Sequence, residues 1–278
     1  MNANQEDLEM ICKSLWGTTQ VPFAAASPQA FGHPGYEKAL GQLQQLVALR
    51  SSGLLHGENG VGKSYLTGKL LENLPEKAWE IHYLAHSTLS GSDLLRTLCR
   101  QTGVRPCMRR SDNIALLEEH WRSLGSRKAL IVLEEAQNLA VTALEEVRLL
   151  ACSQRDTQAP FSLLMIGDGT LLARLKMSVN RPLLARLSYC IELRALDRQE
   201  ARRYLEARWK YVGVQANPME DSAQELILDA SGGIPRQINH LAQRAIEAAA
   251  GQKSATVTSD HVQQALEQMP WLAMTMSS

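Results

Sequence analysis

The sequence predicts an α/β fold with one parallel sheet, followed by an all-helical region. Short apolar segments alternate with segments of helical spacing up to residue 196. A glycine-rich loop with the pattern G-x-x-x-x-G-K-S occupies residues 57–64, between an apolar segment and a helical one. Strands that alternate with helices pair in parallel through right-handed crossovers. We therefore expect a five-stranded parallel sheet with helices on both faces.

The elements follow from local pattern. The strand candidates are short apolar runs bounded by turn residues, at residues 53–56, 79–84, 129–133, 161–167 and 189–193. The helix candidates before residue 196 have apolar residues three or four positions apart, at residues 6–15, 36–49, 65–74, 92–102, 113–124 and 142–152. Prolines predict a loop over residues 20–34. After residue 196 the spacing is helical to about residue 269, and Asp197 with Glu200 forms a capping-box pattern at its start. The expected domains are a tail over residues 1–30, an α/β domain over 31–196 and a helical domain over 197–278, which ends in a short tail.

Composition excludes some classes of protein. The chain has 29 basic and 29 acidic side chains, so a DNA-binding surface would need local segregation of charge. No apolar run is long enough to span a bilayer, and the N-terminus lacks a signal pattern. Five dispersed cysteines without a C-x-x-C pair fit reduced thiols. We expect a cytoplasmic protein without membrane contact.

The glycine-rich loop predicts a site for ATP and Mg²⁺. It reads Gly57-Glu58-Asn59-Gly60-Val61-Gly62-Lys63-Ser64, and Tyr65 follows it. Glycines let backbone N–H groups surround a phosphate, and the helix that follows points its positive end at the same place. Lys63 can reach the β- and γ-phosphates, and the Ser64 hydroxyl can bind Mg²⁺. A chance glycine-rich turn is the plainer interpretation, which the flanking strand and helix disfavour.

Two acids follow the third strand candidate. Glu134 and Glu135 lie directly after the apolar run at residues 129–133. Open α/β sheets bind ligands at the carboxyl ends of their strands. We expect Glu134 to hold Mg²⁺ and Glu135 to orient the attacking water. Alone, the pair would equally suit two solvated acids that open a helix.

Several arginines are candidates for anion contacts. Arg236 follows Gly232-Gly233-Ile234-Pro235 and lies in a first helical turn, where a cation is unfavourable unless an anion offsets it. Bound nucleotide phosphate is the expected anion, and a nearby acid at the surface is the alternative. Arg181 and Arg186 precede the fifth strand; either can be a finger for a neighbouring subunit's phosphate or a solvated arginine. A basic stretch suits either the DNA backbone or a solvated helix face, slightly favouring the latter; it comprises Arg96, Arg100, Arg105, Arg109 and Arg110.

Taken in order, these motifs resemble the AAA+ ATPases of the TniB/TnsC and ExeA kind. The resemblance rests on the glycine-rich loop, Leu133-Glu134-Glu135-Ala136-Gln137-Asn138-Leu139, Leu164-Met165-Ile166-Gly167-Asp168 and Gly232-Gly233-Ile234-Pro235-Arg236-Gln237-Ile238-Asn239. It implies an AAA+ core with strand order 5-1-4-3-2, a helical lid domain, nucleotide bound at subunit interfaces, and assembly into a ring or a helical filament.

The same resemblance implies roles for single residues. Asp168 falls near the first sensor, Arg236 matches the second sensor, and Arg186, with Arg181 as the alternative, matches the finger. Two positions depart from the family pattern. Glu134 stands where the family usually has Asp, which allows for slow hydrolysis, and Asp168 stands where a neutral polar residue is common.

Two branches of the resemblance imply different functions. The secretion ATPases of the ExeA kind carry a membrane span and a cell-wall-binding segment, whereas this chain ends after its lid. The expected function is therefore that of an ATPase regulator of DNA transposition. Such a protein oligomerises on double-stranded DNA and recruits or activates a transposase for target-site selection, with a target-selector protein as a further partner. The alternatives are a secretion or assembly ATPase without DNA binding, and a nucleotide-gated module with negligible turnover.

Overall fold

The computed structural model describes residues 3–24, 31–85, 88–152 and 161–273. Part of the loop expected at residues 20–34 and the expected C-terminal tail lie outside these ranges. The chain forms two compact units, one of residues 34–59 and 63–193, the other of residues 1–33, 60–62 and 194–278. Within the described ranges, none of the helices has the length and apolar character needed to cross a bilayer.

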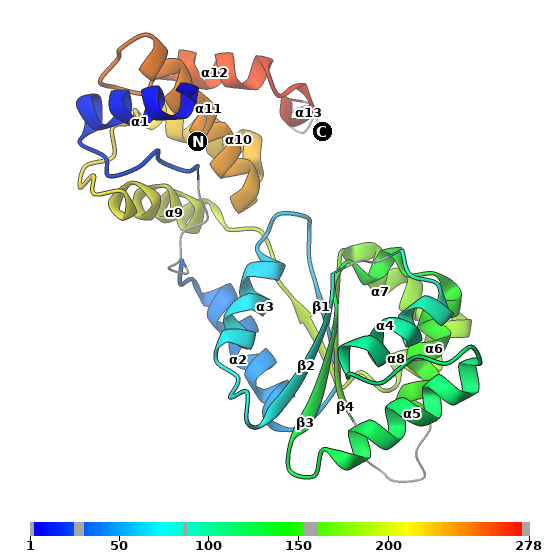
Figure 1. The fold of residues 1–278 in the computed structure, drawn as a ribbon. Coiled ribbons are helices and arrows are strands. Elements are labelled where there is room, and N and C mark those ends of the chain that lie inside the picture. Colours follow the sequence, from blue (N-terminus) through cyan, green and yellow to red (C-terminus); the bar gives the residue numbers. More distant parts are fainter. Residues whose placement is uncertain (1–2, 25–30, 86–87, 153–160, 274–278) are drawn as a thin grey trace. The chain divides into compact units, whose positions relative to one another are not determined.

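The first unit contains a five-stranded parallel sheet (Figure 1). Its strands are β1 (Gly53–His56), β2 (Trp79–Leu84), β3 (Lys128–Leu133), β4 (Phe161–Gly167) and β5 (Tyr189–Glu192). The order across the sheet is β2-β3-β4-β1-β5. The central strands β3 and β4 are almost wholly buried and apolar because helices cover both faces. The five strand predictions are confirmed, and so is the order that the AAA+ resemblance implied.

Seven helices flank the sheet in the described part of this unit: α2 (Pro34–Ala48), α3 (Lys63–Glu72), α4 (Gly91–Gln101), α5 (Arg110–Ser123), α6 (Val141–Cys152), α7 (Gly169–Lys176) and α8 (Arg181–Leu184). One face carries α2 and α3, and the other carries α4 to α8 (Figure 1). Two short 3₁₀ turns, η1 (Ala136–Asn138) and η2 (Ser178–Asn180), follow β3 and α7. Sequence spacing did not predict α7 and α8, because eight and four residues are too few to establish a helical period.

The second unit is helical. It consists of α1 (Ala3–Trp16), α9 (Arg198–Tyr211), α10 (Asp221–Ser231), α11 (Pro235–Gly251), α12 (Ser259–Glu267) and α13 (Pro270–Ala273). The predicted capping box is confirmed: the Asp197 carboxylate accepts from the Glu200 N–H at 2.8 Å, and Glu200 accepts from the Asp197 N–H at 3.0 Å. Trp209 is fully buried at the centre of this unit's core.

The N-terminal segment differs from the expected separate tail. Helix α1 packs against α11, and Cys12 is fully buried in the core of the helical unit. The Trp16 indole N–H donates to the Ala255 carbonyl at 2.7 Å, and the Trp16 ring packs edge-on against Trp209. Burial raises the pKa of the Cys12 thiol to about 11. Residues 3–24 thus complete a helical core whose other members lie after residue 193.

A buried histidine predicts that the α/β unit loses stability in acid. His82 on β2 is buried, with Nε2 3.1 Å from Oε1 of Glu80. The same oxygen is 2.6 Å from Nε2 of His120, and Arg127 lies 3.7 Å from Oε2. Burial lowers the pKa of His82, while the Glu80 carboxylate opposes that shift. The imidazole therefore takes up a proton more readily in the unfolded chain.

We expect the free energy of unfolding to decrease as the pH falls below about 6.5, the pKa of an unfolded histidine. The unfolded state binds the extra proton in that range, so stability is lost toward acid. Urea denaturation at several pH values gives the free energy of unfolding as a function of pH. This free energy should change less steeply with pH for His82→Gln than for the parent chain. The exposed His240 provides the control, and His240→Gln should keep the parent slope. Equal slopes in all three proteins would contradict this assignment.

Candidate functional site

The glycine-rich loop connects β1 to α3. Gly60 and Gly62 have φ angles of 96° and 107°, which glycine adopts without steric cost. Helix α3 begins at Lys63, directly after the second of these residues. The backbone thus turns sharply and presents a helix N-terminus at the carboxyl end of β1. This is the arrangement that phosphate-binding loops require.

Lys63 is held over this loop. Its side chain is 6% exposed, and Nζ donates to the carbonyls of Gly57 at 2.7 Å and Glu58 at 2.9 Å. The buried Thr67 hydroxyl donates to the Lys63 carbonyl at 3.0 Å, which fixes the first turn of α3. The ammonium group is therefore placed at the loop, where the oxygens of a bound phosphate can replace its carbonyl partners.

Glu134 lies beside this loop, although its strand is not adjacent to β1. The Glu134 N–H donates to the Leu84 carbonyl at 3.0 Å, extending the pairing of β3 with β2 by one residue. One carboxylate oxygen accepts from the Ser64 hydroxyl and the other from the Tyr83 hydroxyl. Burial and the Glu134 carboxylate together raise the pKa of Tyr83.

The two residues expected to bind Mg²⁺ are thus brought together. A serine hydroxyl and a carboxylate are hard oxygen donors of the kind that Mg²⁺ prefers, so the residues present fit the ion. Two protein donors also suit an ion that usually keeps several waters and takes phosphate oxygens. Among the described residues, no group of three or more His, Cys, Asp or Glu side chains is placed to hold a metal ion.

Glu135 occupies a strained backbone position. Its φ of 50° is left-handed, which is uncommon for a residue other than glycine. The Gln137 side-chain amide donates to Oε2 of Glu135 at 2.7 Å, and the Asn138 N–H donates to the Glu135 carbonyl at 2.9 Å. The first bond orients the carboxylate, and the second closes the turn. Strain of this kind is typical of functional sites.

Arg174 on α7 also stabilises this turn, through hydrogen bonds to main-chain carbonyls. Its guanidinium donates to the carbonyls of Gln137 and Leu139, the latter at 2.8 Å. Asn180 donates to the Arg174 carbonyl at 2.9 Å. Sequence reasoning missed Tyr83, Gln137 and Arg174. Only Tyr83 carried a usable signal, because it lies near the end of β2 and the carboxyl ends of parallel strands meet at one edge.

Asp168 serves as the N-cap of α7. It accepts from the Thr170 N–H at 2.9 Å and from the Thr170 hydroxyl at 2.5 Å. These hydrogen bonds lower the pKa of Asp168, and the positive charge of Lys63 makes a smaller contribution in the same direction. The carboxylate is therefore ionised and partly occupied by its capping role, while its charge still acts on the Lys63 ammonium.

The predicted anion-binding arginines occupy exposed positions. Arg181 begins α8, and Arg186 follows the end of that helix. Neither forms an ion pair with any residue that the structure describes. Arg236 lies in the first turn of α11, in the helical unit. The finger and sensor roles of these residues stay predictions.

The basic stretch is only partly available to a ligand. Arg100, Arg105 and Arg109 are exposed, whereas Arg96 is half-buried on α4. Nε of Arg110 lies 2.5 Å from Oε1 of Glu146, a largely buried carboxylate. Arg110 is exposed too, but its charge is already balanced, so Arg100, Arg105 and Arg109 are the better candidates for DNA contact.

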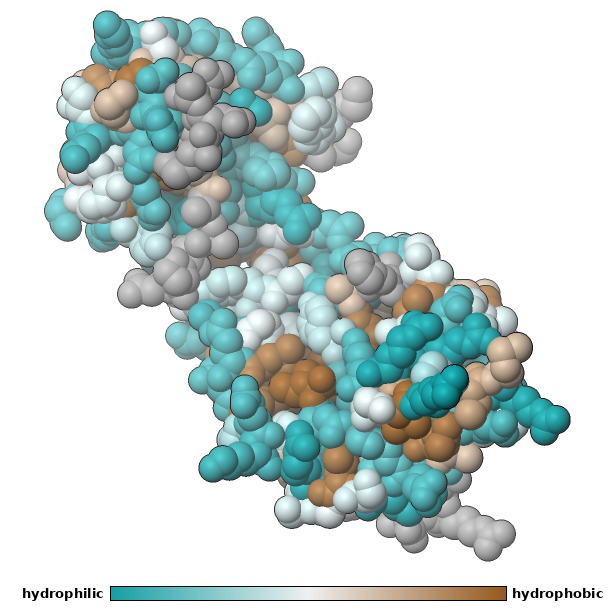
Figure 2. Space-filling view, viewed as in Figure 1, coloured by the Kyte–Doolittle hydropathy of each residue, from teal (hydrophilic) through white to brown (hydrophobic). Residues whose placement is uncertain are grey.

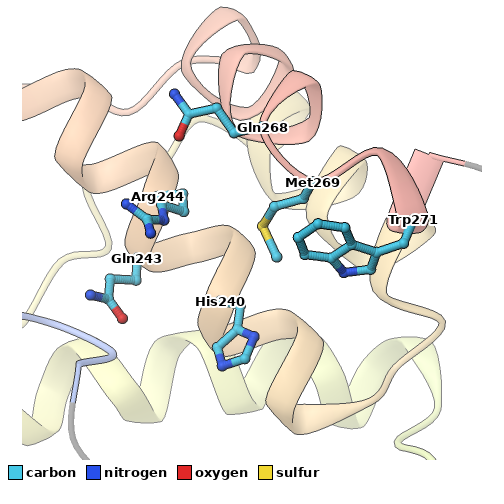
Figure 3. Close-up of a pocket in the computed structure, with 6 residues that line it drawn as sticks. All are labelled: His240, Gln243, Arg244, Gln268, Met269 and Trp271. Carbon is cyan, nitrogen blue, oxygen red and sulfur yellow. The ribbon is translucent and has the colours of Figure 1, made fainter.

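The helical unit contains a separate cavity of about 370 Å³ (Figure 3). Its lining residues are His240, Gln243 and Arg244 on α11 and Gln268, Met269 and Trp271 near α13. Trp271 is 63% exposed, and its ring lies beside Met269 (Figure 3). Arg244 is paired with Glu247 at 2.8 Å. None of the residues predicted from the sequence to form a site lines this cavity.

Comparisons with known proteins agree with the fold. Residues 47–175 match the protein family described as AAA domain. General secretion pathway protein A of Aeromonas hydrophila is 28% identical over 206 residues, which is 70% of this chain and 36% of that protein. The chain thus spans about a third of the length of this curated relative.

Two solved structures share the fold at low identity. The Cdc6p structure from Pyrobaculum aerophilum has a TM-score of 0.69 and 21% identity, covering 92% of this chain and 70% of that chain. The Aeropyrum pernix ORC1 protein, solved in complex with DNA, has a TM-score of 0.66 and 19% identity. The match covers 86% of this chain and 66% of that chain.

The match of residues 47–175 to the AAA domain family agrees with the fold of the chain and with its phosphate loop. The predicted AAA+ fold is confirmed. Within that class, the similarity to the secretion protein matches the ExeA part of the predicted resemblance. The TniB/TnsC branch stays a prediction.

Replacing Lys63 by Ala should remove most of the affinity for ATP, since this ammonium is the cation held at the phosphate loop. A loss of about 100-fold is expected from deleting a charge-assisted contact in a partly buried site. Fluorescent-nucleotide titration measures it. Lys69→Ala is the matched control, because Lys69 lies on the same helix, is half-buried and is paired with Glu72. Equal affinities for the two variants would refute the assignment of Lys63.

Proposed function

We propose that this chain is an ATPase that binds ATP and Mg²⁺ at subunit interfaces, oligomerises on double-stranded DNA and recruits or activates a transposase. The observation that carries the ATPase part is the meeting of Lys63, Ser64, Glu134 and Glu135 at the carboxyl edge of the sheet. A triphosphate-binding loop that faces two carboxylates is the arrangement of P-loop hydrolases.

In this proposal the residues divide the chemistry of hydrolysis. Lys63 binds the β- and γ-phosphate oxygens, and Ser64 with Glu134 would hold Mg²⁺. The ion, when bound, neutralises charge on the phosphates. Glu135 orients the attacking water and polarises it, while Gln137 keeps that carboxylate in position. Arg186 or Arg181 is supplied to the nucleotide of a neighbouring subunit, and Arg236 contributes a further cation to bound phosphate.

Replacing Glu135 by Gln should abolish ATP hydrolysis, because the general base is lost. The affinity for ATP should stay near the parent value, because the phosphate loop and Lys63 are unchanged. Replacing Gln137 by Ala should lower kcat by about 10- to 100-fold, part of what a positioned general base contributes. Steady-state phosphate release measures both effects. If Glu135→Gln hydrolyses ATP at the parent rate, Glu135 is not the residue that orients the attacking water. If the parent chain itself releases no phosphate, the chain is a nucleotide-gated module with negligible turnover.

The DNA-binding part rests on Arg100, Arg105 and Arg109, which are exposed on and after α4. It is supported by the likeness in fold to an ORC1 protein solved with DNA. With equal numbers of acidic and basic side chains overall, attraction to DNA must come from such a local group. Nucleotide at a subunit interface would then couple assembly on DNA to the ATP state.

A gel-shift assay with a non-hydrolysable ATP analogue and random duplex DNA should show a retained complex that weakens steeply between about 50 and 200 mM salt. The double variant Arg100→Glu/Arg105→Glu should lose this complex and keep its ATP affinity. Lys38→Glu/Lys77→Glu, with the same change in charge at exposed positions of the same unit, is the control. Retention of DNA by the arginine variant would exclude this surface.

A secretion or assembly ATPase without DNA binding is the second candidate, favoured by the similarity to general secretion pathway protein A. Under this function ATP-dependent oligomers form but no duplex is retained, even at low salt. The cavity beside Trp271 suits a partner protein under either function, because tryptophan is enriched at protein interfaces and Trp271 is largely exposed. The partner would be a transposase or target selector under the first function and a secretion component under the second.

A further inference from the structure

Met108 is the most exposed large apolar side chain that the structure describes, with 90% of its surface in solvent. It lies in the loop between α4 and α5. The buried faces of these helices supply Leu94, Leu95, Leu98 and Leu117 to the core of the α/β unit. Met108 takes no part in that core, so packing gives no reason for a methionine here.

The loop that carries Met108 is firmly held. Asn113 is buried, and its side-chain amide clamps Cys107 from both sides: Oδ1 accepts from the Cys107 N–H at 2.6 Å, and Nδ2 donates to the Cys107 carbonyl at 3.1 Å. Pro106 restricts the residue before it. The Val104 N–H donates to the Cys99 carbonyl at 2.9 Å. The backbone next to Met108 is therefore fixed in position by these hydrogen bonds.

Positive charge surrounds this side chain. Arg105 and Arg109 flank it in the loop, and Arg100 lies near the end of α4; all three are exposed. Among the described residues, none of the three has an ion-pair partner. Asp112 is the exposed acid in the first turn of α5, so the group keeps a net positive charge. Figure 2 shows apolar side chains beside strongly hydrophilic ones over the part of the unit that carries α4 and α5.

A single apolar side chain between arginines fits duplex DNA better than a protein surface. Methionine and arginine also occur at protein interfaces, but three exposed arginines without an ion-pair partner among the described residues suit a polyanion. The apolar side chain that they flank is 90% exposed. Proteins that enter the minor groove combine arginines with an apolar wedge such as methionine, which separates two base pairs.

We propose that Met108 inserts at a base step from the minor groove of duplex DNA, while Arg105 and Arg109 bind the phosphates on either side. This inference rests on the proposed DNA binding and adds a mode of contact to it. It requires no base sequence, because any step that opens easily would accept the wedge. A wedge at each bound subunit would bend or unwind the DNA that the protein covers.

The wedge can be tested with duplexes that carry 2-aminopurine, whose fluorescence increases when it unstacks. With a non-hydrolysable ATP analogue, the full chain should raise this fluorescence. Met108→Ala should remove the increase and weaken binding by about ten-fold, the effect of losing burial of part of a methionine side chain. The salt dependence of DNA binding should be the same for Met108→Ala as for the parent. Arg109→Gln should instead lower the salt slope by about one. Leu49→Ala, at an apolar residue 67% exposed in the same unit, should behave as the parent.

The outcomes separate this inference from the proposed function. If the parent binds duplex DNA but Met108→Ala binds and unstacks equally well, the wedge is refuted and DNA binding stands. If Met108→Ala changes sedimentation without DNA, the side chain belongs to an interface between copies of this chain, which also refutes the wedge. If the parent binds no duplex in any nucleotide state, the DNA-binding function and the wedge are both overturned.

Discussion

The bond between the Ser64 hydroxyl and the Glu134 carboxylate joins the phosphate loop to the end of β3. The sheet order makes this bond informative, because β4 lies between β3 and β1 and the two residues come from strands that do not touch. Gly167 ends the intervening strand, and a Cβ atom there would lie 2.7 Å from Oε1 of Gln137. Absence of a side chain at this point leaves space for the groups that converge from both sides.

The backbone at Glu135 is held in a left-handed conformation that costs free energy. A left-handed backbone at a residue other than glycine costs of the order of 1 kcal/mol or more and persists only where its surroundings enforce it. Gln137 and Arg174 supply that enforcement through side-chain and main-chain hydrogen bonds. Glu134 has a different support, since the Tyr83 hydroxyl binds its second oxygen. A longer side chain than the family's usual Asp thus has both oxygens held by hydroxyl groups.

Much of this arrangement could be predicted from the sequence, because the strands are short apolar runs and the phosphate loop is a contiguous motif. Glu134 and Glu135 could be predicted because they directly follow one of these apolar runs. Tyr83 and Arg174 were not predicted, since their contacts join segments far apart in the chain and depend on the sheet order. The N-terminal helix was predicted, but its packing with residues after 193 was not, because spacing defines a buried face without defining what covers it.

The central claim is that Ser64 and Glu134 form the metal-binding side of a triphosphate site, and titration calorimetry with a non-hydrolysable ATP analogue tests it most directly. In the parent chain, added Mg²⁺ should tighten binding. In Glu134→Gln the carboxylate charge is absent, so the gain from Mg²⁺ should shrink while metal-free binding stays the same or improves. An unchanged gain from Mg²⁺ in Glu134→Gln would contradict the account.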